Sequence, residues 1–129
     1  MFHYLSLSEI QELVNSNIND VFVCIDHNAK GERGLIDTIA NALNSPYKDD
    51  NWDGITEVLI DPFWLNDQVV RIIHYELPDL SDDEMRVYLS ILKYISDEWS
   101  KKEDFRPGAH CPDLIIYFHT DLKNEIDQY

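Results

Sequence analysis

The sequence is short of basic residues and glycine, and each shortage argues against a class of function. Ten Lys and Arg residues stand against 25 Asp and Glu residues, so the formal net charge is −15. Affinity for phosphates depends on clustered cations, and no run of lysines or arginines is present, so direct nucleic-acid binding is disfavoured. The four glycines form no phosphate-binding loop. No apolar run approaches membrane-spanning length, so membrane insertion is not expected.

Cysteine is also scarce. The two cysteines, Cys24 and Cys111, form neither a CxxC motif nor an evenly spaced framework. We therefore expect reduced thiols rather than disulfides. The opening residues MFHYLSLSEI lack the basic flank and apolar run of a signal peptide. Together these features predict a cytoplasmic protein.

What the sequence does contain is enough apolar material for one folded domain. It has 129 residues, 44% of them hydrophobic, with three Trp, seven Tyr and five Phe. This length is typical of a single domain, so we expect one domain over residues 1–129. Its core is expected at about 21–119, with a helical N-terminal extension at 1–20 and a loose or helical tail at 120–129.

Apolar runs rich in β-branched residues predict strands over 21–25, 69–74 and 114–118. Apolar residues at helical spacing predict four helices, over about 7–16, 35–43, 51–60 and 82–99. The polar stretch DHNAKGERG, residues 26–34, is expected to be a loop.

Two of these helices carry a start signal. Ser6 with Glu9, and Ser81 with Glu84, have the Ser-x-x-Glu spacing in which a hydroxyl and a carboxylate satisfy free amides. The long helix that follows Ser81 has a single apolar face, made of Met85, Tyr88, Leu89, Leu92, Ile95 and Trp99.

The order of these elements predicts an α/β fold. Strands that are apolar on both faces and alternate with helices are typical of a parallel sheet with right-handed crossovers. We expect a small three-stranded parallel sheet covered by helices, with an extra N-terminal helix.

The stretch DDNWD, residues 49–53, crowds carboxylates around the start of a helix. Asp49 and Asp50 need no functional explanation, because the helix dipole favours negative charge there. Asp53 and Glu57 differ, since like charges four residues apart cost a helix about 0.2–0.5 kcal/mol. Such a pair suggests either a surface for a cationic partner or simply a solvated helix face.

Aromatic residues flank these acids, and carboxylates interleaved with aromatics suit arginine and lysine side chains. Trp52 is expected in the core, whereas Trp64 suits either the core or a contact. The candidate partner-binding residues are Tyr47, Asp49, Asp50, Asn51, Asp53, Thr56, Glu57 and Trp64.

The stretch LIDTIANALNSPYKDDNWDGITEVLIDPFW, residues 35–64, resembles the barstar family, the bacterial intracellular inhibitors of secreted ribonucleases. That family carries an amphipathic helix, a proline, a tyrosine-bearing loop, an Asn-x-Asp helix start, a further acid and a closing tryptophan. The positions that match here are Pro46, Tyr47, Asn51-Trp52-Asp53, Gly54-Ile55, Glu57, Leu59, Asp61 and Trp64. The order of strands and helices over residues 21–119 is also similar.

This sequence departs from the family pattern at three places. The loop between Pro46 and Asn51 is shorter and lacks the family's glycine. Glu57 stands where the family usually has Asp, and Thr56 stands where an aromatic is common. These changes alter reach at an interface and so bear on the identity of the target.

The resemblance implies a stoichiometric inhibitor or immunity protein, not an enzyme, that needs no cofactor or metal. Its loop and helix from Tyr47 to Glu57 would occlude the active site of a basic toxin, most simply a ribonuclease. A protein partner is expected, with no direct nucleic-acid or membrane contact.

An enzyme is one alternative. In a parallel sheet, three pairs would follow strand ends at the carboxyl edge, where α/β sheets place ligands. These pairs are Asp26 with His27, His74 with Glu76, and His119 with Asp121. They could bind a metal or transfer protons, although no nucleophile motif or helical ligand spacing accompanies them. The neighbouring His110 and Cys111 are not expected to converge on one ion.

An acidic interaction module is the second alternative. Such a protein would mimic nucleic acid for a basic partner without inhibiting a nuclease. Its surface would be the same, so the activity of the bound partner distinguishes the two.

Overall fold

The computed structural model describes residues 2–45, 51–60, 65, 68–101 and 112–129, with the backbone alone at 57, 58 and 60. Its four strands are β1 (Phe2–Leu5), β2 (Val21–Ile25), β3 (Val69–His74) and β4 (Asp113–His119). Its helices are α1 (Leu7–Ser16), α2 (Gly31–Leu43), α3 (Trp52–Ile60), α4 (Asp82–Ser100) and α5 (Lys123–Ile126), the last preceded by the 3-10 turn η3 (Thr120–Leu122). The mixed α/β architecture is therefore confirmed.

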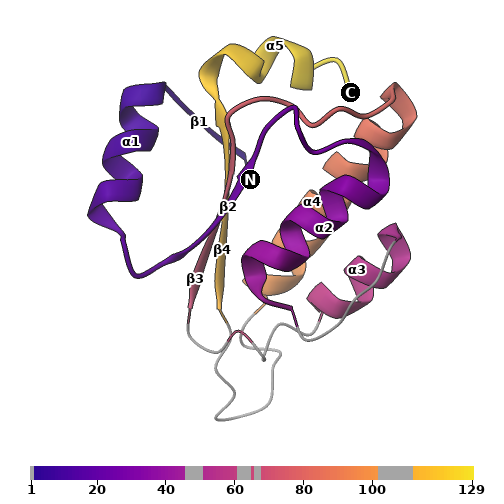
Figure 1. Ribbon diagram of the computed structural model, residues 1–129, viewed down its shortest axis with the longest axis horizontal. Coiled ribbons are helices and arrows are strands. Elements are labelled where there is room, and N and C mark those ends of the chain that lie inside the picture. Colours follow the sequence, from indigo (N-terminus) through magenta and orange to yellow (C-terminus); the bar gives the residue numbers. More distant parts are fainter. Residues whose placement is uncertain (1, 46–50, 61–64, 66–67, 102–111) are drawn as a thin grey trace.

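All four strands are parallel, in the order β1-β4-β3-β2. Figure 1 shows the sheet between two layers, with α1 on one face and α2, α3 and α4 on the other. Right-handed crossovers explain this arrangement. The connections from β2 to β3 and from β3 to β4 cross the sheet in one direction, whereas the connection from β1 to β2 crosses it in the opposite direction. The helix α1 must therefore cover the opposite face.

The expected number of strands is wrong, because β1 adds a fourth. The sheet pairs Phe2 with Ile116 and Leu5 with His119. The ring centroid of Phe2 lies 5.0 Å from that of Phe118, which also lies 6.0 Å from that of Tyr4. A four-residue strand that ends directly at a helix cap has no room for an apolar run, so its signal in the sequence is weak.

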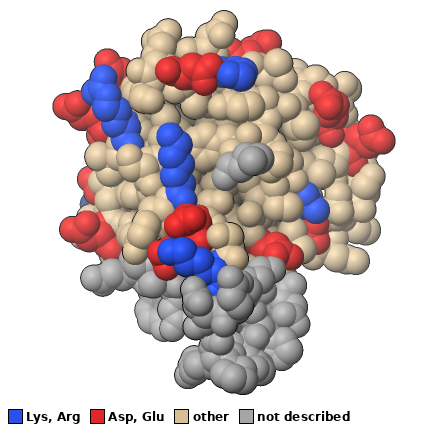
Figure 2. All heavy atoms as spheres, turned by 180° about the vertical axis from the view of Figure 1, so that it is seen from behind, with Lys and Arg blue, Asp and Glu red and all other residues tan. Residues whose placement is uncertain are grey.

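Lysines cover the aromatic side chains of β1, which is an edge strand. Lys93 Nζ lies 5.6 Å from the ring centroid of Phe2, and Lys123 Nζ lies 5.4 Å from that of Tyr4. Both lysines come from helices, Lys93 from α4 and Lys123 from α5, so the helices place positive charge over the aromatic rings of the edge strand. Seen from behind, the surface carries both signs of charge, with acidic side chains gathered mostly towards the rim (Figure 2).

Both expected capping boxes are present. Ser6 Oγ accepts from the Glu9 N–H at 3.2 Å, and the Glu9 carboxylate accepts from the Ser6 N–H at 3.0 Å. Ser81 and Glu84 make the same pair of bonds at the start of α4. The starts of α1 and α4 are thus satisfied by residues within one turn.

The helix α2 begins earlier than expected, because residues 31–34 are helical rather than part of a loop. Gly31 takes a left-handed φ of 68°, and its N–H donates to the Asp79 carbonyl at 2.9 Å. The two glycines in this segment lower its helix propensity. The start of α2 therefore depends on the long-range bond from Gly31 to Asp79, which lies in the loop after β3. Asn44, also left-handed, ends the helix.

The larger core fills the space between the sheet and the helices α2, α3 and α4. The predicted apolar face of α4 is buried there in full, at Met85, Tyr88, Leu89, Leu92, Ile95 and Trp99. A smaller cluster of Ile10, Ile73 and Tyr117 joins α1 to the other face of the sheet. Of the helices in the described part of the chain, none is long and apolar enough to cross a membrane.

Candidate functional site

The start of α3 is the centre of the predicted partner-binding site. The side-chain oxygen of Asn51 accepts from the Gly54 N–H at 2.8 Å, so Asn51 caps the helix as its position suggests. Asp53, in the first turn, is exposed. The structure thus places an amide cap and an exposed carboxylate together at one helix end.

The structure describes only part of the predicted set. Thr56 is half-buried, and its hydroxyl donates to the Trp52 carbonyl at 2.6 Å. Its hydroxyl is therefore bonded within α3. Glu57 belongs to α3, one turn after Asp53, but its side chain lies outside the described residues. The remaining predicted contacts also lie outside them, namely Tyr47, Asp49, Asp50 and Trp64.

Packing against α4 holds the inner face of α3. Ile55 and Leu59 are buried, and the half-buried Trp52 stacks on Tyr88 with ring centroids 6.1 Å apart. At the other end of α3, the Trp99 indole N–H donates to the Leu59 carbonyl at 2.7 Å. The cavity left between the sheet and the helices α2, α3 and α4 is only about 20 Å³ and apolar, so the core beneath α3 is almost fully packed.

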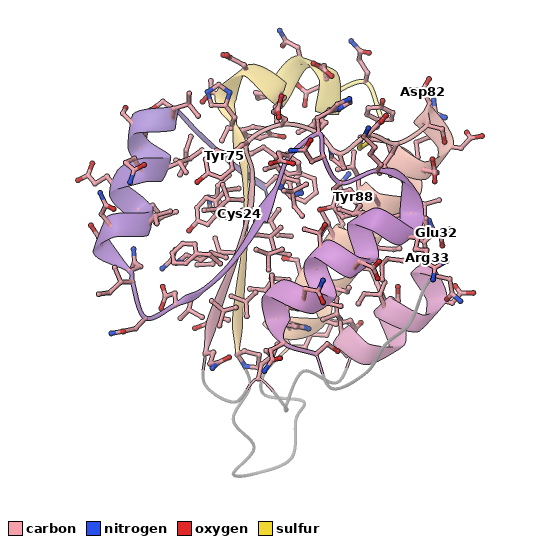
Figure 3. All side chains as sticks on the ribbon, in the orientation of Figure 1. Cys24, Glu32, Arg33, Tyr75, Asp82 and Tyr88 are labelled. Carbon is pink, nitrogen blue, oxygen red and sulfur yellow. The ribbon has the colours of Figure 1, made fainter. Side chains whose placement is uncertain are left out.

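A carboxylate from α2 completes the support of α3. Glu32 Oε1 accepts from the Trp52 N–H at 2.8 Å, and the Glu32 N–H donates to Glu84 Oε2 at 3.2 Å. Figure 3 shows Glu32 in the first turn of α2, on the side that faces α3. Three helix starts, those of α2, α3 and α4, therefore meet at two carboxylates.

The first turn of α4 adds more negative charge to this corner of the molecule. It carries Asp82, Asp83 and Glu84 in succession. The Ser81 backbone N–H donates to the Glu84 carboxylate and holds its pKa below the usual range. Asp83 is almost fully exposed and pairs with Arg86 at 3.1 Å.

Beneath Trp52, a buried polar pair links α4 to the sheet. His74 Nδ1 lies 2.9 Å from the Tyr117 carbonyl oxygen. Because a carbonyl only accepts, Nδ1 carries the proton, and His74 Nε2 accepts from the Tyr88 hydroxyl at 2.5 Å. Burial lowers the pKa of His74 from 6.5 to about 4 and raises the pKa of Tyr88, so both are neutral at pH 7.

Two histidine pairs of the enzyme alternative lie side by side, because the His27 backbone N–H donates to the Glu76 carboxylate at 3.4 Å, but the pairs form no metal-binding group among the described residues. His74 is fully buried with both ring nitrogens bonded, so it is not available to a substrate. His27 lies 4.0 Å from Asp79, while His119 lies 3.7 Å from Asp121. Among the described residues, no group of three or more His, Cys, Asp or Glu could hold a metal ion. Cys24 is a free thiol, and His110 and Cys111 lie outside the described part.

Sequence reasoning missed the residues that support the site. Glu32 lies 20 residues before its partner Trp52, and Trp99 lies 40 residues after Leu59. A charged residue near two glycines carries no local sign of such a contact. Periodicity predicts that Trp99 lies in the core, but the partner of its indole N–H follows only from the packing of α4 against α3.

Comparison with known proteins gives one structural likeness. A search of curated protein sequences finds no match. The crystal structure of Cdc6p from Pyrobaculum aerophilum is similar, with a TM-score of 0.53 and 21% sequence identity. The match covers 98% of this chain and 34% of that chain, so this chain spans about a third of that protein's length. At this identity the likeness shows the fold alone.

The connection between the first strand and the first helix forms no phosphate-binding loop. Where β1 meets the helix α1, the connection is Ser6 alone. A loop that cradles phosphates needs a run of glycines and backbone amides between strand and helix. The β1–α1 connection instead forms a helix cap.

A family comparison is more specific. The family model described as "Barstar (barnase inhibitor)" matches residues 20–108. The match begins just before β2 and includes α2, α3, β3 and α4, together with the site at the start of α3. It leaves β1 and α1 outside at one end, and β4, η3 and α5 outside at the other. Because the match covers more than half of the sequence, the chain belongs to the barstar family.

Proposed function

We propose that this protein is a stoichiometric inhibitor of a basic toxin nuclease of the ribonuclease class. It acts as an immunity protein by occluding the nuclease active site with the loop and helix from Tyr47 to Glu57. The observation that carries the proposal is the family match, which spans this segment and is named for inhibition of barnase. The net charge of −15 suits a cationic partner.

The chemistry of the target explains how such a protein would inhibit it. A nuclease groove binds the phosphates of its substrate through cationic side chains. Carboxylates can pair with the same cations through charge-assisted bonds, yet they offer no phosphodiester bond to cleave. An acidic helix in the groove therefore excludes substrate without being consumed.

The exposed start of α3 is suited to this role. Asp53 is presented by a helix whose inner face is packed and whose two ends are hydrogen-bonded to neighbouring helices. A helix held in this way loses little conformational freedom on binding, which favours affinity. We assign the main contacts to Asp53 and Glu57. Asn51 orients the helix start, and the flanking contacts are Tyr47, Asp49, Asp50, Thr56 and Trp64.

The first test is to identify the partner. The purified protein is used to capture proteins from cells that carry its neighbouring genes, and the bound protein is assayed for ribonuclease activity. A basic nuclease silenced at one-to-one stoichiometry is the expected result. A partner without nuclease activity would overturn inhibition and favour an acidic interaction module.

Two substitutions then test the contact assignment. Asp53→Ala and Glu57→Ala should each weaken binding by about tenfold or more, because a cation of the partner loses its charge-assisted bond. Glu12→Ala is the matched control. Glu12 is exposed on α1, so its substitution removes one negative charge at a distance from α3. Titration calorimetry gives the affinities. If all three variants bind alike, the assignment to α3 is wrong.

A further inference from the structure

The first turn of α3 is capped from two directions. The first amides of a helix have no partner within the helix and need acceptors from elsewhere. The side-chain oxygen of Asn51, the residue before α3, accepts a hydrogen bond from the Gly54 N–H. The Trp52 N–H instead donates to the carboxylate of Glu32, which comes from the first turn of α2. The start of α3 is thus tied to another helix.

Glu32 is itself fixed by a second carboxylate. Its N–H donates to Glu84 Oε2, while Glu84 Oε1 accepts from the Ser81 N–H at 3.0 Å. The connection therefore runs from α4 through α2 to α3. Because the positive ends of three helix dipoles meet here, the electrostatic environment favours both carboxylates.

This connection ends next to the leading contact residue. Trp52 is held through its backbone by Glu32 and through its ring by Tyr88. Asp53 is the next residue along the helix. Successive residues of a helix are related by a fixed rotation, so whatever holds Trp52 also sets the direction in which position 53 projects.

We propose that Glu32 is a positioning residue for the partner-binding face of α3. It sets the direction of Asp53 through the Trp52 amide and makes no contact with the partner itself. This inference rests on the proposed inhibitory function. By holding the helix start in place before binding, Glu32 reduces the ordering cost of forming the complex.

Two substitutions separate positioning from a direct effect of charge. Glu32→Gln removes the charge but keeps a side-chain oxygen that can accept from the Trp52 N–H. Glu32→Ala removes both. A positioning role therefore predicts a large effect of Glu32→Ala and a small effect of Glu32→Gln, whereas a direct charge effect predicts equal losses.

Hydrogen exchange of the free protein is the first measurement. In Glu32→Ala, the amides at the start of α3 should exchange about tenfold faster, because a charge-assisted bond is lost, while α1 stays unchanged. Glu32→Gln should exchange almost as the unsubstituted protein does. Glu9→Ala is the control, because it removes the equivalent cap from α1 and should accelerate exchange there alone. Unchanged exchange of α3 in Glu32→Ala, or equal acceleration throughout the molecule, would overturn the proposal.

Binding is the second measurement, with barnase and the captured nuclease as probes. Glu32→Ala should weaken the complex about tenfold, mainly through faster dissociation, while Glu32→Gln stays within about threefold of the unsubstituted protein. Equal losses in both variants, with slower association, would show that Glu32 acts through its charge and would overturn positioning. If the unsubstituted protein binds no nuclease, the proposed function fails, and the exchange measurement still decides whether Glu32 holds α3.

Discussion

The helices α1 and α3 are of similar length but are held in place in different ways. The start of α1 is satisfied within one turn, by Ser6 and Glu9. The start of α3 depends on Glu32 of α2, and its other end depends on Trp99 of α4. The first helix carries its own cap, whereas the second receives much of its support from the surrounding fold.

This difference matches what each helix has to do. The helix α1 covers the sheet face opposite the larger core, through a small cluster that contains Ile10. The helix α3 presents Asp53, which we assign to the partner. A binding surface benefits from being fixed by several neighbours, because each restraint lowers the entropy lost on association.

The largest expected effect comes from removing the anchor at the end of α3. Trp99→Ala should lower the free energy of unfolding by about 3–5 kcal/mol, because it leaves a cavity and removes the bond to the Leu59 carbonyl. Urea denaturation followed by circular dichroism measures this change.

Leu7→Ala, on the outer side of α1, is the contrasting variant. Leu7 is 57% exposed, so its loss should change the free energy of unfolding by no more than about 0.5 kcal/mol. Comparable losses in the two variants would contradict the contrast between the helices.

The next largest effect is a pH dependence of the free energy of unfolding that arises from His74. The unfolded chain binds a proton near pH 6.5, whereas folded His74 stays neutral down to about pH 4. Its contribution is therefore fully present above pH 6.5 and is lost as the pH falls towards 4. A shift of this size corresponds to about 3 kcal/mol across that window.

Comparison with His74→Gln isolates this contribution from the titration of the many carboxylates. Glutamine can donate to the Tyr117 carbonyl and accept from Tyr88, but it does not titrate. The unsubstituted protein should lose more stability between pH 7 and pH 5 than the variant does, in urea denaturation at both values. Parallel pH profiles would show that His74 makes no such contribution.

The smallest expected change in stability comes from removing the helix caps of α1 and α3. Ser6→Ala and Asn51→Ala should each lower the free energy of unfolding by about 1 kcal/mol, because each leaves one helix amide without its acceptor. Only Asn51→Ala should also weaken nuclease binding. Thermal denaturation and calorimetry measure the two quantities. If Ser6→Ala weakens binding equally, the site extends beyond α3.

The elements that the sequence predicts well are those specified by neighbouring residues. The starts of α1 and α4 follow from Ser-x-x-Glu spacing, and β2, β3 and β4 follow from continuous apolar runs. By contrast, β1 is too short for a pattern. Gly31 starts a helix because of a bond to Asp79, which is distant in sequence.

The candidate site divides in the same way. Asn51 and Asp53 follow from local spacing and from the family resemblance, and the structure places both at the start of α3. Their support could not be predicted, because Glu32 reaches Trp52 only after α2 and α3 have packed together. The buried bond between Tyr88 and His74 likewise joins a helix to a strand.

The pairing of β1 with β4 has a consequence for synthesis on the ribosome. Phe2 aligns with Ile116, so more than a hundred residues must be translated after β1 before its neighbour exists. At roughly 5–20 residues per second, that delay is on the order of ten seconds. During this time the aromatic rings of Phe2 and Tyr4 have no strand to pack against. Nascent chains of this protein therefore expose these rings until β4 has emerged, and apolar surface exposed in this way favours aggregation.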